Sequence, residues 1–309
     1  MLNILFAARS EGWEEYEAPL AQAFASAGIT ARIAPDMPPA EVDYIVYAPN
    51  SSVQDFTPFT RLKAVLNLWA GVETVVGNTT LNVPLTRMAD DGMTEGMIDY
   101  VIAHIMRYHV GLDAHVINPA KRWEDSPPPL ARHRRVAFLG IGALGGACAQ
   151  KAAGLGFQVL GWSRSPKTLA GVESHHGRDG LHAVLSKAEI VVLLMPNTPE
   201  TENTLNAETL AWLPKGARII NPGRGPLIDD DALLAALNSG HIAHATLDVF
   251  RTEPLPADHP YWAHPSVTVT PHIASTTRPD LASERIAENI RLNEAGQPML
   301  DVVDRAAGY

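Results

Sequence analysis

The chain has 309 residues, 46% of them hydrophobic and 19% charged, which suits a globular enzyme of two domains. Its net charge of −10 excludes the positive field that nucleic acid or an anionic membrane surface would need in a partner. The single cysteine, Cys148, allows no intrachain disulfide and favours a reducing, cytoplasmic compartment.

In the first third of the chain, short apolar runs alternate with helical patterns, which is typical of βαβ units around a parallel sheet. The amino-terminal apolar run is too short for a signal peptide or a membrane span and predicts the first strand. A helix is expected over 14–27, ending at Gly28, and a longer one from Thr94 to about His115. The expected strands are Asn3–Ala8, Ile29–Ala34, Tyr44–Ala48, Ala64–Leu68 and Leu85–Met88.

The segment Lys121–Arg135 breaks this pattern, because three consecutive prolines and several basic residues cannot form a regular element. We expect a surface arm at about 121–133. The α/β pattern then restarts with further strands and helices. These are strands at Arg135–Leu139, Gln158–Trp162, Ile190–Met195, Ala217–Ile220, Ala245–Val249 and Val267–Thr270, and helices at Leu144–Leu155 and Asp280–Ala295. Two successive blocks of this kind predict two doubly wound parallel-sheet domains.

A glycine-rich turn, Gly140-Ile-Gly-Ala-Leu-Gly145, follows an expected strand and opens an expected helix. In this context the spacing indicates dinucleotide binding. Gly140 permits the tight turn, Gly142 lets the backbone approach a pyrophosphate, and Gly145 allows the helix to pack on the strand. The amino terminus of the helix would offer N–H groups and a positive dipole end to the phosphates.

The end of the next strand predicts which dinucleotide binds. NAD-specific enzymes usually place Asp or Glu there to hold the ribose 2′-hydroxyl, but here the segment is Trp162-Ser-Arg-Ser165, with Lys167 close behind and no carboxylate nearby. Arg164 can bind a 2′-phosphate through a charge-assisted fork, and Ser163 and Ser165 can donate hydrogen bonds. We therefore expect NADPH to be preferred, with NADH as the weaker cofactor; the alternative is a solvated basic turn.

Three polar residues follow successive expected strands at their carboxyl ends, where α/β sheets place their chemistry: Arg224, Glu253 and His272. A guanidinium can pair with a carboxylate and polarise a ketone. A protonated imidazole can give a carbonyl oxygen its proton, and a neighbouring carboxylate favours that imidazolium. Each residue alone could be a surface ion pair, a solvated acid or a cap. Together, downstream of a nucleotide-binding turn, they predict reduction of a 2-keto acid.

Twelve histidines raise the question of a metal site. The pairs His175-His176 and His241/His244 are closely spaced, but we place them in exposed Gly-rich turns without a third ligand, so no metal is expected. Cys148 follows the glycine-rich turn within a helix, and we expect a small buried residue there, not a nucleophile.

Several segments resemble the D-isomer-specific 2-hydroxyacid dehydrogenase family: Gly140–Gly145, Asn221–Asp229, Leu247–Pro256 and Pro271–Ser275. The resemblance covers essentially the whole chain. Finer features are similar to the glyoxylate/hydroxypyruvate reductase A branch of the family. They are Trp162–Ser165, Leu193–Thr198, Val83–Met88 and Val303–Tyr309.

The resemblance implies roles by position. Arg224, Glu253 and His272 match the catalytic residues of the family, and Asp248 matches an Asp near the nicotinamide amide. The implied cofactor-binding residues are Gly140, Gly142, Ala143, Leu144, Gly145, Trp162, Ser163, Arg164, Ser165, Lys167, Met195, Pro196, Asn197, Pro222, Gly223, Asp248, His272 and Ala274. The implied substrate-binding residues are Tyr47, Trp69, Ala70, Gly71, Arg224 and His272.

The resemblance also implies discontinuous domains. Residues 1–100 and 276–309 would form a flavodoxin-like substrate-binding domain, and residues 101–275 an NADP-binding Rossmann domain, with a cleft between them. Members of the family are typically dimers joined through the coenzyme domains, which would give the arm at about 121–133 a role. Trp123 in this arm could belong to a dimer contact, a pocket or a core.

We therefore predict a cytoplasmic enzyme that transfers a hydride from NADPH to glyoxylate or hydroxypyruvate, with His272 as proton donor. It would bind neither nucleic acid nor a membrane. One alternative is a reductase of a bulkier 2-keto acid such as phenylpyruvate, although Trp69 and Tyr47 would restrict the room. Another is a nucleotide-sensing protein that does not turn over, against which the intact catalytic set argues.

Overall fold

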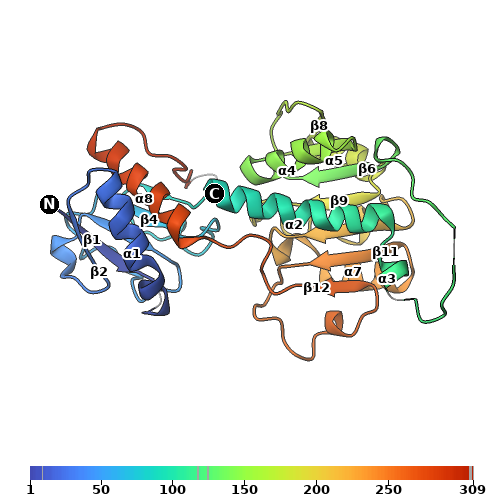
Figure 1. The fold of residues 1–309 in the computed structure, drawn as a ribbon, viewed down its shortest axis with the longest axis horizontal. Helices are drawn as coiled ribbons and strands as arrows, with labels where there is room; N and C mark the ends of the chain where they lie inside the picture. Colours follow the sequence, from blue (N-terminus) through green and yellow to red (C-terminus); the bar gives the residue numbers. More distant parts are fainter. Residues whose placement is uncertain (9, 117, 124, 306–307, 309) are drawn as a thin grey trace. The chain divides into compact units, whose positions relative to one another are not determined.

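The computed structural model describes residues 1–8, 10–116, 118–123, 125–305 and 308 (Figure 1). The chain divides into two compact units: unit 1 comprises Met1–Met93 and Thr276–Tyr309, and unit 2 comprises Thr94–Ser275. The first division falls before the expected boundary after residue 100. The reason is that helix α2 (Asp91–Val110) packs, from its second turn on, in the core of unit 2.

Unit 1 contains a five-stranded parallel sheet of order β2-β1-β3-β4-β5. Its strands are β1 (Leu2–Ala7), β2 (Ala31–Ala34), β3 (Tyr44–Tyr47), β4 (Ala64–Asn67) and β5 (Leu85–Thr86). Helices α1 (Ser10–Ser26) and α8 (Pro279–Glu294) lie side by side in this unit (Figure 1), and Phe6 of β1 contacts Trp13 and Tyr16 of α1. The strand order is that of flavodoxin-like folds, so this part of the prediction is confirmed.

Unit 2 contains a seven-stranded parallel sheet of order β12-β11-β10-β9-β6-β7-β8. Its strands are β6 (Arg135–Leu139), β7 (Gln158–Ser163), β8 (Val172–His176), β9 (Ile190–Leu193), β10 (Ala217–Asn221), β11 (Ile242–Leu247) and β12 (Val267–Val269). The chain winds outward from β6 through β7 and β8, and then in the other direction through β9. The sheet therefore has a switch point between β6 and β9, where doubly wound sheets bind nucleotides.

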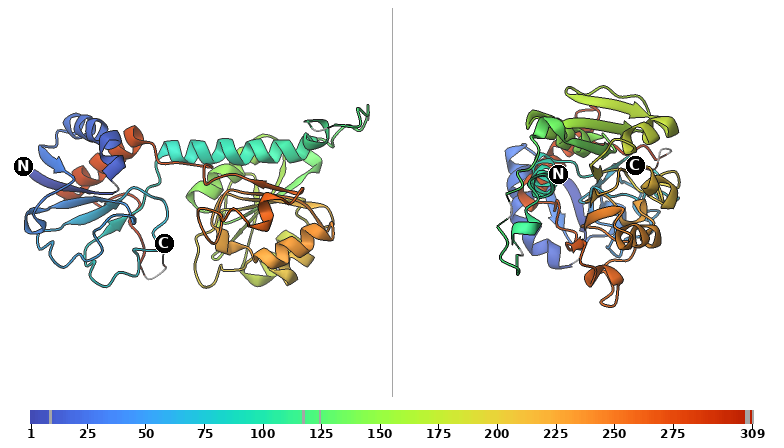
Figure 2. Two further views of the ribbon diagram at one scale, coloured as in Figure 1. Left: turned by 90° about the horizontal axis from the view of Figure 1, so that it is seen from below. Right: turned by 90° about the vertical axis from the view of Figure 1, so that its right-hand side faces the viewer.

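Helices cover both faces of the unit 2 sheet (Figure 2). One face holds α2 and α4 (Ala143–Gly154), packed against Val136 and Phe138 of β6. The other face packs Ala137 and Leu139 of β6 against three helices, α5 (Gly177–Leu185), α6 (Ala207–Ala211) and α7 (Asp230–Asn238). Because successive strand residues point to opposite faces and both faces are buried, β6 is a continuous apolar run rather than an alternating one.

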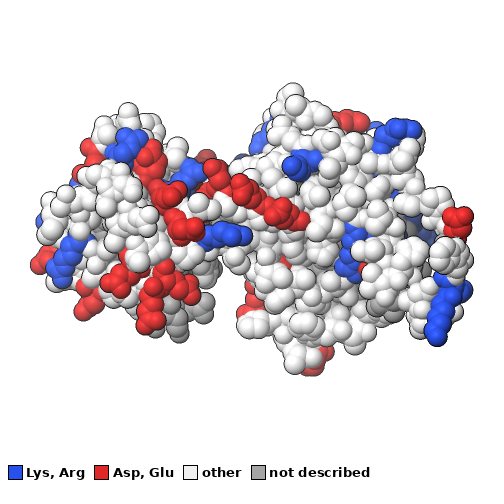
Figure 3. Space-filling model, in the orientation of Figure 1, with Lys and Arg blue, Asp and Glu red and all other residues white. Residues whose placement is uncertain are grey.

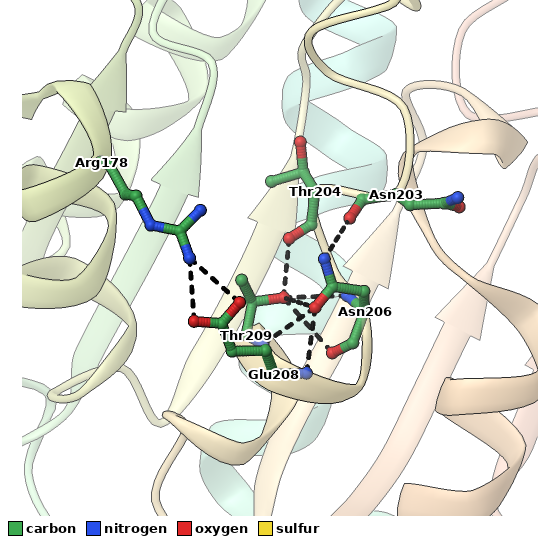
Figure 4. Close-up of polar contacts among 6 residues, drawn as sticks. All are labelled: Arg178, Asn203, Thr204, Asn206, Glu208 and Thr209. Atoms are coloured by element: carbon green, nitrogen blue, oxygen red, sulfur yellow. Dashed lines mark hydrogen bonds and ion pairs between the residues drawn. The ribbon is translucent and has the colours of Figure 1, made fainter.

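Helices α5 and α6 of this face are joined by polar contacts (Figure 4). Asn206 caps α6: its Oδ1 accepts hydrogen bonds from the N–H groups of Glu208 and Thr209 at 3.0 and 3.2 Å, and its own N–H donates to the Thr209 hydroxyl. Arg178 of α5 donates to both carboxylate oxygens of Glu208, at 2.8 and 3.0 Å. Both partners are exposed, so the ion pair adds at most about 1 kcal/mol and the cap determines where α6 begins.

Two expectations about local structure are wrong. The long helix expected from Thr94 to His115 is two helices, because Gly111 takes a φ of +67° and ends α2 before α3 (Asp113–Val116). His175 and His176 lie in β8, and His244 lies inside β11, not in exposed turns. The edge strand β8 has no apolar alternation, because its residues are largely polar and only partly covered.

The described residues also form the short 3-10 helices η1 (Pro39–Glu41), η2 (Ala131–His133), η3 (Gly225–Leu227) and η4 (Pro260–Trp262). Within the described part of the chain, none of the helices has the length and apolar character that crossing a bilayer requires.

Candidate active site

The glycine-rich turn connects β6 to α4 as the sequence predicts. A Cβ at Gly145 would lie 1.9 Å from the carbonyl oxygen of Gly140, so only glycine lets the helix approach the strand this closely. A Cβ at Gly142, the N-cap of α4, would meet nothing within 4 Å. The Cβ position of Gly142 is therefore open at the start of the helix, where we expect the helix N–H groups to bind a dinucleotide pyrophosphate.

Two cationic residues, Arg164 and Lys167, follow β7. Lys167 donates from Nζ to the carbonyl oxygen of Ile141 within the turn, at 3.4 Å. Arg164 is exposed. The pKa of Glu200 is lowered by hydrogen bonds from its own N–H and from Thr198, and also by the charge of Arg164, which places Arg164 near the loop after β9. The strand end thus presents positive charge where a ribose 2′-phosphate would bind.

His272 and Glu253 form a direct pair. Nδ1 of His272 lies 2.7 Å from Oε2 of Glu253, and the N–H of Phe250 donates to Oε1 at 2.8 Å, so both carboxylate oxygens are held. The hydrogen bond to Glu253 raises the pKa of His272 above its ordinary value, against the effect of burial. Burial alone would raise the pKa of Glu253, but the hydrogen bonds from His272 and Phe250 lower it. The pair thus favours an imidazolium whose Nε2 is available to a substrate.

Arg224 lies within electrostatic reach of this pair. Besides burial and the hydrogen bonds just described, its charge acts to lower the pKa of both His272 and Glu253. The guanidinium donates from Nη1 to the Gly223 carbonyl oxygen at 2.7 Å. Buried Asn221 shapes the turn, donating to the Arg224 carbonyl oxygen at 2.9 Å and accepting from the Gly223 N–H at 3.2 Å. The structure therefore brings together the three residues predicted to be catalytic.

The loops that carry Arg224 and Glu253 are in close contact. A Cβ at Gly225 would lie 2.0 Å from the backbone carbonyl carbon of Phe250, so the loops meet at this glycine. Arg251 also joins them, because its Nη2 donates to the carbonyl oxygens of Ile228 and Pro226, at 2.6 and 3.3 Å. Sequence reasoning missed Arg251, since its partners, which also include Glu202 and Asp230, lie more than 20 residues away in the chain. The turn at Asn221 could have been predicted from the sequence, because Asn before Pro-Gly is typical of a turn.

Asp248 is 0% exposed and accepts hydrogen bonds from the loop that carries His272. The N–H groups of Ile273 and Ala274 donate to its carboxylate oxygens at 2.9 and 2.8 Å, and the His272 N–H donates to its carbonyl oxygen at 2.8 Å. The carboxylate thus faces protein groups. Its expected contact with a nicotinamide amide stays a prediction.

The expected substrate loop follows β4 in unit 1. Buried Asn67 donates from Nδ2 to the carbonyl oxygens of Trp69 and Gly71, at 2.8 and 3.0 Å, and so shapes the loop. Trp69 is 43% exposed. Tyr47, predicted to line the substrate pocket, is 1% exposed and packs against Phe56 in the core, because β3 is buried on both faces. The substrate contacts of this loop stay a prediction.

The other residues expected to contact the cofactor lie where strands of unit 2 end. Pro196 and Asn197 follow β9 and are partly exposed, whereas the side chain of Met195 is buried in the core. Pro222 and Gly223 are buried after β10, and Ala274 is buried after β12. These positions agree with a site at the carboxyl edge of the sheet, and their contacts with the cofactor stay predictions.

Cys148 is fully buried, and burial raises the pKa of its thiol to about 12, so the prediction of a small buried residue is confirmed. Among the described residues, no group of three or more His, Cys, Asp or Glu side chains is placed to hold a metal ion.

Comparisons with known proteins agree with this geometry. Residues 100–274 match the family described as D-isomer specific 2-hydroxyacid dehydrogenase, NAD binding domain. The chain is 39% identical to glyoxylate/hydroxypyruvate reductase A of Serratia proteamaculans, with 100% of both proteins covered.

Solved structures extend the comparison. A D-isomer specific 2-hydroxyacid dehydrogenase from Xanthobacter autotrophicus, in complex with NADPH and MES, is 42% identical over 99% of both chains, with a TM-score of 0.93. An NADPH-dependent glyoxylate/hydroxypyruvate reductase from Sinorhizobium meliloti, in complex with NADP and sulfate, is 32% identical over 100% of both chains, with a TM-score of 0.87. The resemblance noted in the sequence is confirmed, and the chain belongs to the D-isomer specific 2-hydroxyacid dehydrogenase family of oxidoreductases.

Proposed function

We propose that this enzyme uses NADPH to reduce glyoxylate to glycolate and hydroxypyruvate to D-glycerate. The observation that carries the proposal is the His272–Glu253 pair, with 2.7 Å between Nδ1 and Oε2 and Arg224 within electrostatic reach. Relatives of the full chain that bear the name glyoxylate/hydroxypyruvate reductase A support the substrate class. Unit 2 would bind the coenzyme, and unit 1 would serve substrate binding.

Each catalytic residue has a distinct task in this mechanism. When bound, the nicotinamide cofactor supplies the hydride that reduces the 2-keto carbon. Arg224 pairs with the substrate carboxylate and polarises the keto oxygen. His272 gives that oxygen a proton from Nε2, while Glu253 orients the ring and stabilises its charged form. The turn Gly140–Gly145 would hold the pyrophosphate of the cofactor.

A substrate panel tests the proposal. The purified enzyme is assayed with glyoxylate, hydroxypyruvate and phenylpyruvate, each with NADPH and with NADH. We expect the highest kcat/KM for one of the two small acids with NADPH. A higher kcat/KM for phenylpyruvate would overturn the substrate class, and binding of NADPH without turnover of any keto acid would favour a nucleotide-sensing protein.

Arg164 is expected to provide much of the preference for NADPH. Arg164→Asp replaces a cation with a carboxylate that repels the 2′-phosphate, so KM for NADPH should rise about tenfold or more as a charge-assisted hydrogen bond is lost. KM for NADH should change little. Lys215→Asp, the same charge change at an exposed site before β10, is the control. Equal effects of the Arg164 substitution on both cofactors would contradict this role.

Glu253 is expected to set the pH range of the reaction. Reduction requires the imidazolium, so kcat/KM for glyoxylate should fall as pH rises through the pKa of His272, which lies above its ordinary value. Glu253→Gln removes the main cause of that elevation, so this decline should begin at lower pH. The wild-type loss of activity in acid, as Glu253 protonates below its ordinary range, should disappear. Glu208→Gln, at an exposed ion pair, should leave the profile unchanged.

We also propose a cytoplasmic homodimer joined through unit 2. Figure 1 draws the arm after α3 as a loop that stands off from the strands of unit 2, and Trp123 within it is 98% exposed, which excludes core packing. Val116 and Leu130 add apolar surface that a second copy would cover. Light scattering should give the mass of two chains, and of one chain for Trp123→Ser if this surface is the contact.

Figure 3 shows Asp and Glu gathered over α1 and α8, a face unsuited to nucleic acid.

A further inference from the structure

A chain of hydroxyl groups runs from helix α2 to the loop that carries His272. Tyr100 Oη lies 2.7 Å from Thr270 Oγ1, and Thr270 Oγ1 lies 2.6 Å from Oδ1 of Asp248. Both carboxylate oxygens of Asp248 also accept N–H groups, so the carboxylate acts as the acceptor. Thr270 must therefore donate to Asp248, and its oxygen accepts from Tyr100. The chain has one direction, from Tyr100 through Thr270 to Asp248.

At the end of this chain of hydroxyl groups, the backbone of His272 has an unfavourable conformation that other contacts must stabilise. His272 has a φ of +54°, in the left-handed region that disfavours residues other than glycine. Asp248 stabilises this conformation by accepting the N–H groups of His272, Ile273 and Ala274. The position of the imidazole next to Glu253 thus depends on where the buried carboxylate of Asp248 lies.

Helix α2, which carries Tyr100, is held close to the loop that carries His272. A Cβ at Gly96 would lie 3.4 Å from Oγ of Ser275 and 3.8 Å from the carbonyl oxygen of Ala274, so the helix passes directly beside the loop. One turn on, the ring of Tyr100 packs on His104 with centroids 4.5 Å apart. Burial raises the pKa of Tyr100, so its hydroxyl stays a donor at all working pH values.

We propose that Tyr100 and Thr270 are positioning residues that hold His272 in its reactive place through Asp248. Neither hydroxyl needs to touch substrate or cofactor, because both act on the backbone of the loop. The proposal rests on the proposed function in so far as His272 is the proton donor.

The same helix offers a matched control. Tyr108, two turns further along α2, bonds the buried hydroxyl of Thr246 at 2.6 Å. Tyr108→Phe and Thr246→Val therefore remove the same groups from the same kind of contact, but from one that does not include the His272 loop. If the hydroxyl groups only stabilise the fold, Tyr100→Phe and Thr270→Val should change kcat no more than Tyr108→Phe and Thr246→Val do.

Kinetics give the first readout. Thr270→Val should lower kcat for glyoxylate roughly ten- to a hundredfold, because a small displacement of a catalytic group is costly, while KM for NADPH should stay within about twofold. Thr270→Ser should restore most of kcat, and Tyr100→Phe should give a smaller loss. Adding Tyr100→Phe to Thr270→Val should lower kcat no further, since Tyr100 acts through Thr270. If Thr270→Val does not fold, Tyr100→Phe alone carries the test.

An NMR titration of His272 gives a second readout that does not need turnover, with its signal assigned by its absence in His272→Gln. The charged groups that face the ring, Glu253, Asp248 and Arg224, are unchanged in these variants. The pKa of His272 should fall in Thr270→Val, as the ring moves off Glu253, and stay constant in the controls. An unchanged pKa and kcat with a lower Tm would overturn the proposal. A lowered pKa in an enzyme that reduces no 2-keto acid would refute the proposed function and support the positioning role.

Discussion

His272→Gln should remove almost all turnover, with kcat for glyoxylate falling by roughly 10² to 10⁴, the range attributed to general acid catalysis. Glutamine can still hydrogen-bond to Glu253, but it cannot give up a proton. Binding of NADPH, followed by fluorescence titration, should stay nearly unchanged, because we expect the pyrophosphate and the 2′-phosphate to bind at Gly140–Gly145 and near Arg164, elsewhere in unit 2. In this variant, the rate of reduction should therefore fall while the affinity for NADPH stays nearly constant.

The backbone of His272 requires a second variant. Its φ of +54° is tolerated better by Asn than by Gln, so His272→Asn should keep a higher Tm while losing turnover equally. His264→Gln, at a partly exposed histidine of the same unit, is the control and should retain full activity. Turnover that survives in both His272 variants would assign the proton to another group.

The sequence predicts the parts of the site that depend on local pattern. The turn Gly140–Gly145 is recognisable because its glycines meet steric demands within one strand–turn–helix unit. Arg224, Glu253 and His272 could be named because parallel strands bring their carboxyl ends to one edge of a sheet. Strand order and burial of both sheet faces then follow from continuous apolar runs such as that of β6.

The remainder depends on contacts between distant segments. Tyr47 lies in a strand that is buried on both faces, so its neighbours give no sign of which way its ring points. The polar edge strand β8 has no apolar alternation to reveal it. Arg251 and Thr270 act on groups more than 20 residues away, 23 for the Ile228 carbonyl and 22 for Asp248. A single sequence does not encode such pairings in any local spacing.

Arg224→Lys is the second substitution from which we expect a large loss. Lysine keeps the positive charge but lacks the planar fork that pairs with a carboxylate and a keto oxygen together. Because this pairing strengthens as charge develops on the keto oxygen, kcat/KM for glyoxylate should fall roughly 10² to 10³-fold. Arg218→Lys, near the start of β10, the strand that precedes Arg224, should change kcat/KM little, and KM for NADPH should change little in either variant.

The pH profile separates the charge of Arg224 from its shape. Besides the dominant hydrogen bond from Glu253, the Arg224 charge acts to lower the pKa of His272. Arg224→Gln removes that charge, so the pKa of His272 should rise and the residual activity should persist to higher pH. Arg224→Lys keeps the charge and should leave the profile in place. A profile that does not move in Arg224→Gln would mean that the guanidinium lies too far from the imidazole to share a substrate with it.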